Sequence, residues 1–147
     1  MKNTRNIKYI VIHCTASSPD AKISDIQTYW KNNLGWNNPG YHYIIKRDGE
    51  IVKMQNESQI ANGVRGFNNE CIHISYIGGI DKKGNPVDNR STAQVHAMFD
   101  KIVELTEKYP QAEVKGHRDF PDVHKACPCF DVKEWLRNYE PDLNQAA

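Results

Sequence analysis

The apolar residues of this chain are grouped into short segments that predict strands alternating with helices. The segment from Ile7 to Ile12 is rich in branched and aromatic residues, which is typical of a strand buried on both faces. The segment from Cys71 to Ile77 has the same character, and a further short strand is expected over 113–116. Strands that alternate with helices favour an α/β fold, with the helices packed on a central sheet.

Two apolar segments in the first half of the chain predict an antiparallel hairpin. They cover residues 41–47 and 50–54 and are joined by Asp48-Gly49. Both of these residues tolerate the positive φ angles of a type I′ turn, which commonly joins antiparallel strands. The sheet is therefore expected to be mixed.

Sequence signals for helix starts occur at three places. Ser24 and Ser91 each begin a segment with capping-box spacing, for helices that end near residues 33 and 109, and Asp131 can cap a last helix. The long middle helix is expected to be amphipathic, with a core-facing side formed by Val95, Phe99, Ile102, Val103 and Thr106.

The length of the chain predicts one domain. There are 147 residues, without repeats, linkers or a change in composition, and a domain of this size buries roughly two-thirds of its unfolded surface. We expect a single α/β domain over residues 1–147, with a mixed central sheet, about three flanking helices and a flexible tail from about residue 139.

Charge and hydropathy exclude several classes of partner. Nineteen basic residues balance eighteen acidic ones, for a net charge of +1, so nucleic acid is not expected as a partner. The apolar segment that starts at Ile7 is interrupted by Lys8 and is too short for a signal peptide. No run approaches the roughly 18 apolar residues of a membrane-spanning helix. We expect synthesis in the cytoplasm without a signal peptide, and no insertion into a membrane.

Three residues with metal-binding side chains lie where strands are expected to end or in the loop that follows. His13 follows the first strand, His117 follows the strand over 113–116, and Cys127 comes in the next segment. In the absence of an export signal, cysteines are favoured as free thiols or metal ligands. Two imidazoles and a thiolate are good zinc ligands, and three protein ligands leave the fourth tetrahedral position for water. The residues therefore predict a hydrolytic zinc site at one edge of the sheet.

Four longer segments carry a specific resemblance. They read VIHCTAS, GWNNPGYHYIIKRDGEI, FNNECIHISYIGGID and KGHRDF…HKACPCFD, in that order. With these motifs the chain resembles the zinc-dependent N-acetylmuramoyl-L-alanine amidases of the type 2 family. It is most similar to the T7 lysozyme-type phage endolysins and more distantly similar to the peptidoglycan recognition proteins. The resemblance extends from about Tyr9 to Trp135.

The resemblance implies a reaction and roles for five residues. His13, His117 and Cys127 match the ligands of one zinc ion, and Tyr41 and Lys125 match the catalytic tyrosine and lysine. The implied reaction is hydrolysis of the amide bond between N-acetylmuramic acid and L-alanine in peptidoglycan. The implied protein is a monomer that acts on the cell wall after release or export.

Tyr41 and Lys125 have side chains suited to different steps of amide hydrolysis. The ammonium of Lys125 can stabilise the negative charge that develops on the carbonyl oxygen, a contribution of about 3 kcal/mol by analogy with other oxyanion donors. A phenol with a pKa near 10 is a weak general base, so Tyr41 is expected to act as an orienting donor.

We expect Cys14 and Cys129 to be structural, and His73 and His96 to be structural or solvated. Alternation along the strands separates Cys14 from His13 and His42 from Tyr41, and His73, His96 and Cys129 have no partner in the motif. One position departs from the family pattern. Gly63 stands where many relatives have a histidine, so contacts of that loop with glycan or peptide are in doubt.

Two other functions remain open at this stage. The first is a peptidoglycan recognition module without catalysis, which the presence of Cys127 disfavours, because relatives that only bind typically lack this ligand. The second is a thiol hydrolase with Cys127 as nucleophile and His117 as base. Bound metal distinguishes a zinc enzyme from a thiol enzyme.

Overall fold

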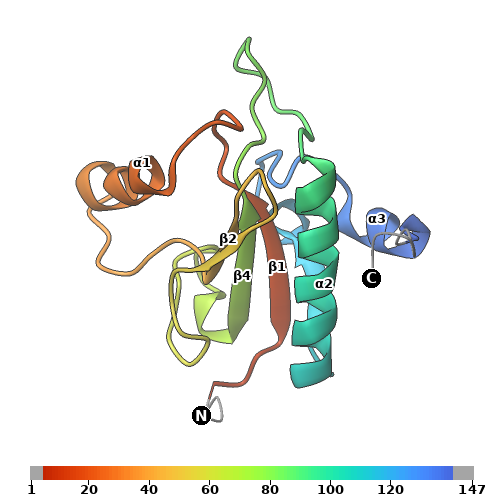
Figure 1. The fold of residues 1–147 in the computed structure, drawn as a ribbon. Coiled ribbons are helices and arrows are strands. Elements are labelled where there is room, and N and C mark those ends of the chain that lie inside the picture. The colour runs from red at the N-terminus through yellow and green to blue at the C-terminus, as the bar shows by residue number, and fades with distance from the viewer. Residues whose placement is uncertain (1–4, 141–147) are drawn as a thin grey trace.

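A mixed five-stranded sheet forms the centre of the structure (Figure 1), which is a computed structural model that describes residues 5–140. Its strands lie in the order β3-β2-β4-β1-β5. Every neighbouring pair is parallel except β2 and β3. The predicted α/β fold with a mixed sheet is confirmed. The strands are β1 (Tyr9–Cys14), β2 (Tyr43–Ile45), β3 (Ile51–Lys53), β4 (Cys71–Tyr76) and β5 (Glu113–Gly116).

The antiparallel pairing of β2 and β3 confirms the predicted hairpin, but its turn differs from the predicted one. Gly49 has a φ of +91°, whereas Asp48 is not in the left-handed region, so the prediction of a type I′ turn is wrong. The N–H of Lys46 donates to Glu50 O at 2.8 Å, which leaves three residues in the loop instead of two. In a three-residue loop only the last residue needs a positive φ, and glycine supplies it.

In the described part of the chain, three α-helices flank the sheet. They are α1 (Ile23–Thr28), which continues as the π-helical turn η1 (Tyr29–Asn33), α2 (Thr92–Lys108) and α3 (Val132–Asn138). Ser91 and Asp131 cap α2 and α3 as predicted. The predicted start of the first helix at Ser24 is wrong, because Lys22 is the N-cap. The carboxylate of Asp25 accepts a hydrogen bond from Lys22 N at 3.2 Å and so fixes the earlier start.

Helices α2 and α3 cover one face of the sheet, where α2 buries Met98, Ile102 and Leu105 together with Gln94. The predicted core-facing side of α2 is therefore wrong apart from Ile102, and Val103 is exposed. Gln94 is the reason. Its Nε2 donates to Ile45 O and Ile77 O, both at 3.1 Å, so this polar side chain is fully hydrogen-bonded in the core. The side of α2 that carries Gln94 therefore faces the sheet.

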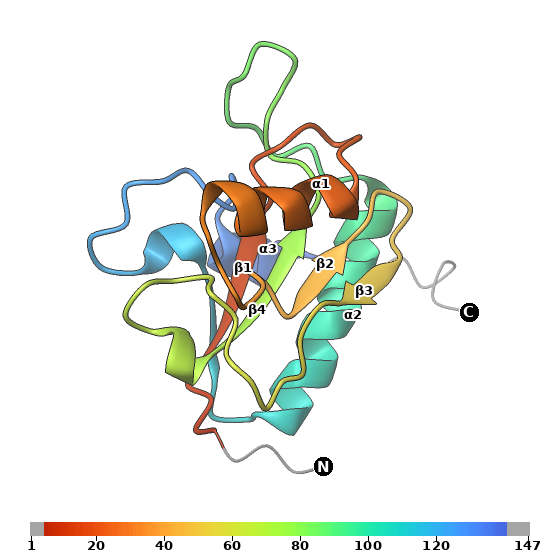
Figure 2. The ribbon, with the colours of Figure 1, turned by 90° about the vertical axis from the view of Figure 1, so that its left-hand side faces the viewer.

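The opposite face of the sheet carries α1 and several loops, and Figure 2 shows α1 in front of the sheet with α2 behind it. Alternation along β1 turns Ile10, Ile12 and Cys14 towards α2, and it turns Val11 and His13 towards the face with α1. Among residues 5–140, no helix combines the length and the apolar character that a membrane crossing requires.

The end of the described chain packs against α2. Tyr139 hydrogen-bonds through its hydroxyl to Nδ1 of His96 at 2.7 Å, and its ring lies 4.9 Å from that of Phe99. The predicted flexible tail from about residue 139 therefore begins with an anchored tyrosine. Residues 141–147 of that tail lie outside the described part of the chain.

Candidate metal centre

His13 and His117 are brought together by the pairing of two parallel strands. Ile12 in β1 lies opposite Gly116 in β5, so the next residue on each strand is a histidine at the same edge of the sheet. His117 begins the short 3-10 helix η3 (His117–Asp119), and the centroids of the two imidazole rings are 4.8 Å apart. His13 is 1% exposed, whereas His117 is partly exposed.

Cys127 lies in a loop that is hydrogen-bonded to β1, to β4 and to η3. Its carbonyl oxygen accepts from Arg118 N at 3.0 Å, and its sulfur accepts from Cys14 N at 3.2 Å. The hydroxyl of Tyr76 donates to Pro128 O at 2.7 Å. A Cβ at Gly116 would lie 2.9 Å from Pro128 Cδ, so the close approach of this loop to β5 depends on glycine.

The three side chains fit a zinc ion. Their ligand atoms all lie within 4.8 Å of one another, and Cys127 Sγ is 3.9 Å from His13 Nδ1. Tetrahedral zinc, with bonds of about 2.0–2.1 Å to nitrogen and about 2.3 Å to sulfur, places its ligand atoms roughly 3.5 Å apart. A small inward movement of the three side chains brings their ligand atoms to this spacing. Within residues 5–140, this is the one cluster of at least three histidine, cysteine or carboxylate side chains that could hold a metal.

Both histidines are held in the form that binds metals. Burial, the neighbouring imidazoles and Lys125 lower the pKa of His13 well below its ordinary value. Burial and then the positive charge of Lys125 lower the pKa of His117 to about 4. At neutral pH both rings are therefore uncharged, and each has a nitrogen lone pair that can bind a cation.

Tyr41 and Lys125 line the same cavity as the three candidate ligands, and its volume is about 640 Å³. The hydroxyl of Tyr41 donates to Cys14 O at 3.2 Å, and its ring lies 5.0 Å from that of His13. Burial and the nearby thiols of Cys127 and Cys14 raise the pKa of Tyr41, so the phenol is protonated at neutral pH. Lys125 is exposed at the rim of the cavity. The structure thus brings together all five residues that the sequence singled out.

The wall of the cavity opposite the candidate ligands is formed by α1, η1 and the segment that follows them. Trp30 and Trp36 line it, and Tyr29 and Leu34 extend it as exposed apolar side chains, 52% and 41% accessible. Exposed apolar side chains beside a polar centre are typical of a binding groove. The arrangement can therefore hold a ligand alongside a bound metal.

Three polar residues near the centre were not identified as functional from the sequence. His73 was expected to be structural or solvated, yet it is fully buried and its Nδ1 lies 2.8 Å from His13 Nε2. His42 is also buried, and its Nδ1 accepts from His73 N at 3.0 Å. Asn68 lies 2.9 Å from the far side of the His73 ring. Alternation along β4 places His73 on the same face as Ser75, but the pairing of β4 with β1 was needed to bring it beside His13.

Cys14 and Cys129, for which a structural role was expected, lie outside the cluster of candidate ligands. Cys14 is buried among the core residues that face α2, and its sulfur lies 3.9 Å from that of Cys129. All four cysteines of the chain are free thiols. Cys14 contacts the candidate metal centre through its backbone, which hydrogen-bonds with Cys127 and Tyr41.

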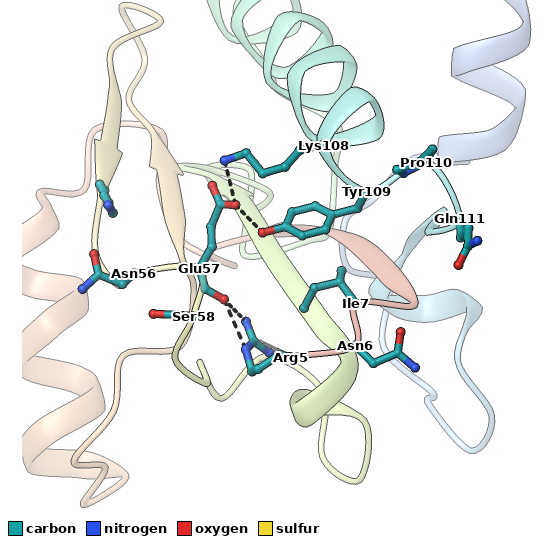
Figure 3. Close-up of a pocket in the computed structure, with 11 residues that line it drawn as sticks. Arg5, Asn6, Ile7, Asn56, Glu57, Ser58, Lys108, Tyr109, Pro110 and Gln111 are labelled. Atoms are coloured by element: carbon teal, nitrogen blue, oxygen red, sulfur yellow. Dashed lines mark hydrogen bonds and ion pairs between the residues drawn. The ribbon is translucent and has the colours of Figure 1, made fainter. Parts of the chain in front are cut away.

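A second cavity, of about 760 Å³, lies at the amino ends of β1 and β5 (Figure 3). The segments 5–7 and 108–111 line it together with Glu57. The carboxylate of Glu57 accepts hydrogen bonds from Tyr109 at 2.7 Å, from Lys108 at 3.1 Å and from Tyr43. The acid is thus surrounded by donors, and among the described residues that line this cavity there is no cluster of metal-binding side chains.

Comparisons with known proteins identify the family and the relatives of this chain. The N-acetylmuramoyl-L-alanine amidase family matches residues 3–130. The endolysin of Escherichia phage T7 is 33% identical over 140 residues, which cover 95% of this chain and 91% of that protein. Among solved structures, the Ph2119 endolysin of a Thermus scotoductus bacteriophage has a TM-score of 0.76 at 27% identity, covering 93% of this chain and 85% of that one. PGRP-SA of Apis mellifera has a TM-score of 0.71 at 22% identity, covering 94% and 88%, and shares the fold.

Proposed function

Since this chain belongs to the N-acetylmuramoyl-L-alanine amidase family, we propose that it is a zinc-dependent hydrolase that cleaves the amide bond between N-acetylmuramic acid and L-alanine in peptidoglycan. The observation that carries the proposal is the convergence of His13, His117 and Cys127 at the floor of a groove that Lys125 and Tyr41 also line. An amidase needs such a centre beside a surface that can hold its polymer substrate.

His13, His117 and Cys127 would hold one zinc ion. Zinc in such a site lowers the pKa of water from about 16 to about 7 and so provides hydroxide at neutral pH. Because both imidazoles are neutral and Cys127 accepts an N–H from Cys14, the chain presents these side chains as acceptors before any metal arrives.

Lys125 and Tyr41 act on the reacting amide. The ammonium of Lys125 stabilises the negative charge that develops on the carbonyl oxygen of the scissile bond, which is worth about 3 kcal/mol for an oxyanion donor. Tyr41 acts as a hydrogen-bond donor, because its pKa is raised and its phenol keeps its proton at neutral pH. The apolar wall with Tyr29 and Leu34 holds the glycan or stem peptide in the groove.

The setting of the reaction follows from the substrate. We expect the protein to act as a monomer on the cell wall, which it reaches after release or export, and to need neither nucleic acid nor membrane insertion. Its activity is that of a bacteriolytic, endolysin-like enzyme.

Digestion of purified peptidoglycan tests the proposal. We expect stem peptides with a new amino-terminal L-alanine to be released, the activity to disappear after chelation, and zinc to restore it. Cleavage that survives complete removal of metal would contradict the zinc mechanism and favour a thiol hydrolase. Binding to the wall without cleavage at any metal loading would favour a recognition module.

A further inference from the structure

A second histidine lies behind the candidate ligand His13, on the neighbouring strand β4. His73 is fully buried, and its Nδ1 lies 2.8 Å from Nε2 of His13. Its own Nε2 lies 2.9 Å from Oδ1 of Asn68, in the short 3-10 helix η2 (Asn68–Glu70) that precedes β4. The three side chains form a line that runs from the candidate metal centre to the partly exposed helix η2.

A backbone amide fixes the direction of each hydrogen bond along this line. The N–H of Val64 can only donate, and it lies 2.7 Å from Oδ1 of Asn68, so this atom is an acceptor. His73 therefore donates to it through Nε2. A neutral imidazole that donates through one nitrogen accepts through the other, so Nδ1 of His73 accepts from Nε2 of His13.

The consequence is that the lone pair of His13 is on Nδ1, the nitrogen that faces Cys127 at 3.9 Å. A histidine binds a metal only through an unprotonated nitrogen, and the hydrogen bond at its other nitrogen decides which tautomer is present. We propose that His73 and Asn68 are positioning residues that hold His13 in the tautomer and ring orientation required to bind the metal. They act through His13 and do not contact the substrate.

Gly63 belongs to the same arrangement. A Cβ on this residue would lie 2.3 Å from Nδ1 of His73, far inside any normal contact distance. The ring of His73 can therefore occupy its place only because residue 63 has no side chain. This chain thus has glycine at position 63, where many relatives have a histidine, and an imidazole from His73 of β4 occupies the space beside it.

Zinc affinity tests this inference without an assay of hydrolysis, although the inference rests on the zinc centre of the proposed function. His73→Leu removes the acceptor, whereas His73→Asn keeps an oxygen at the δ position of the side chain. Loss of such an outer hydrogen-bond partner typically lowers metal affinity about 10- to 100-fold. In competition with a chromophoric chelator, we expect that loss for His73→Leu and clearly tighter binding for His73→Asn. The ligand-field spectrum of bound Co²⁺ should differ from that of the wild type more for His73→Leu than for His73→Asn.

A second matched pair decides the question if a leucine variant at position 73 does not fold. Asn68→Asp keeps the acceptor for both Val64 and His73, and Asn68→Leu removes it, so zinc affinity should fall only in the leucine variant. Equal zinc affinity within each folded pair, at equal unfolding temperatures of the metal-free proteins, would overturn the inference alone. A wild-type protein that binds no zinc at this centre would overturn the proposed function and this inference together.

Discussion

Polar groups lie beside a cavity at both ends of the parallel strands, but only at one end do several potential metal ligands face one another. At the carboxyl ends, His13, His117 and Cys127 turn acceptor atoms towards one another. At the amino ends, Glu57 is an acceptor enclosed by donors. Figure 3 shows Tyr109 and Lys108 at its carboxylate, and Tyr43 donates to the same group.

The difference shows how a functional site can be told from a structural one. Acceptors that face acceptors need a cation or a shared proton between them, whereas an acceptor enclosed by donors is already satisfied. The larger cavity lies at the satisfied end, and the smaller one at the metal centre. Cavity size alone would therefore select the end that lacks the candidate ligands.

The largest expected effect comes from removing the sulfur at the carboxyl ends. Cys127→Ser should lose its bound zinc and with it all measurable amidase activity, because the hydroxyl is a much poorer zinc ligand than a thiolate. The measurements are the metal content of the purified variant and the release of stem peptides. Cys129→Ser, two residues along the same loop, is the matched control and should keep both. A Cys127→Ser variant with a full complement of zinc would refute the assignment of this ligand.

Removing the ammonium at the rim should slow the reaction and leave the metal in place. Lys125→Met is expected to lower kcat about 100- to 1000-fold, the usual cost of losing one oxyanion donor. Lys82→Met, which removes the same charge from an exposed loop, is the control. A Lys125→Met variant with a normal kcat would show that the oxyanion is stabilised by another group.

At the opposite end, a substitution should change stability and leave catalysis intact. Glu57→Gln is expected to lower the free energy of unfolding by about 1–3 kcal/mol at neutral pH, because it weakens a partly buried, charge-assisted set of hydrogen bonds. Denaturant unfolding measures the loss, and kcat should equal that of the wild type. A large fall in kcat with unchanged stability would reverse the contrast between the two ends.

The stability difference between Glu57 and its glutamine variant should also depend on pH. Burial alone would raise the pKa of Glu57, but hydrogen bonds from Tyr43, Tyr109 and Lys108 outweigh burial, and the pKa is lowered. The stabilisation by the ionised carboxylate is therefore complete above the ordinary value of 4.5 and is lost as the pH falls through the lowered value. The difference between the two proteins should shrink over that range. A difference that stays constant with pH would contradict this account of Glu57.

The smallest effect is expected from Tyr41→Phe. As a donor that orients a partner, the hydroxyl should contribute about 1 kcal/mol, or roughly a fivefold change in kcat. A residue that transfers a proton in the transition state typically contributes 10²- to 10⁴-fold. Steady-state kinetics at full zinc loading separate the two roles, and a loss beyond about 100-fold would assign proton transfer to Tyr41.

The sequence predicted the elements that have strong local signals. The apolar segments of β1 and β4 and the caps Ser91 and Asp131 all define elements of the structure, because short-range preferences and tertiary packing agree there. The turn at Gly49 differs from the predicted type I′ turn, because the length of the loop depends on which residues pair across the hairpin. The buried side of α2 differs from the predicted one, because the side chain of Gln94 donates hydrogen bonds to the carbonyl groups of Ile45 and Ile77, far away in the sequence.

The same distinction applies to the metal centre. His13, His117 and Cys127 follow from motifs and from the positions of strand ends, and the structure brings them within reach of one ion. His73 could not be identified in this way, because its relation to His13 depends on the neighbouring positions of β1 and β4 in the sheet. A buried histidine on a strand looks structural until the strand beside it is known.

The most direct test of the central claim is zinc X-ray absorption spectroscopy on the freshly purified protein. The account predicts one zinc ion per chain, with one sulfur at about 2.3 Å and two imidazole nitrogens at about 2.0–2.1 Å. A spectrum without a sulfur ligand, or a protein that takes up no zinc from solution, would contradict it.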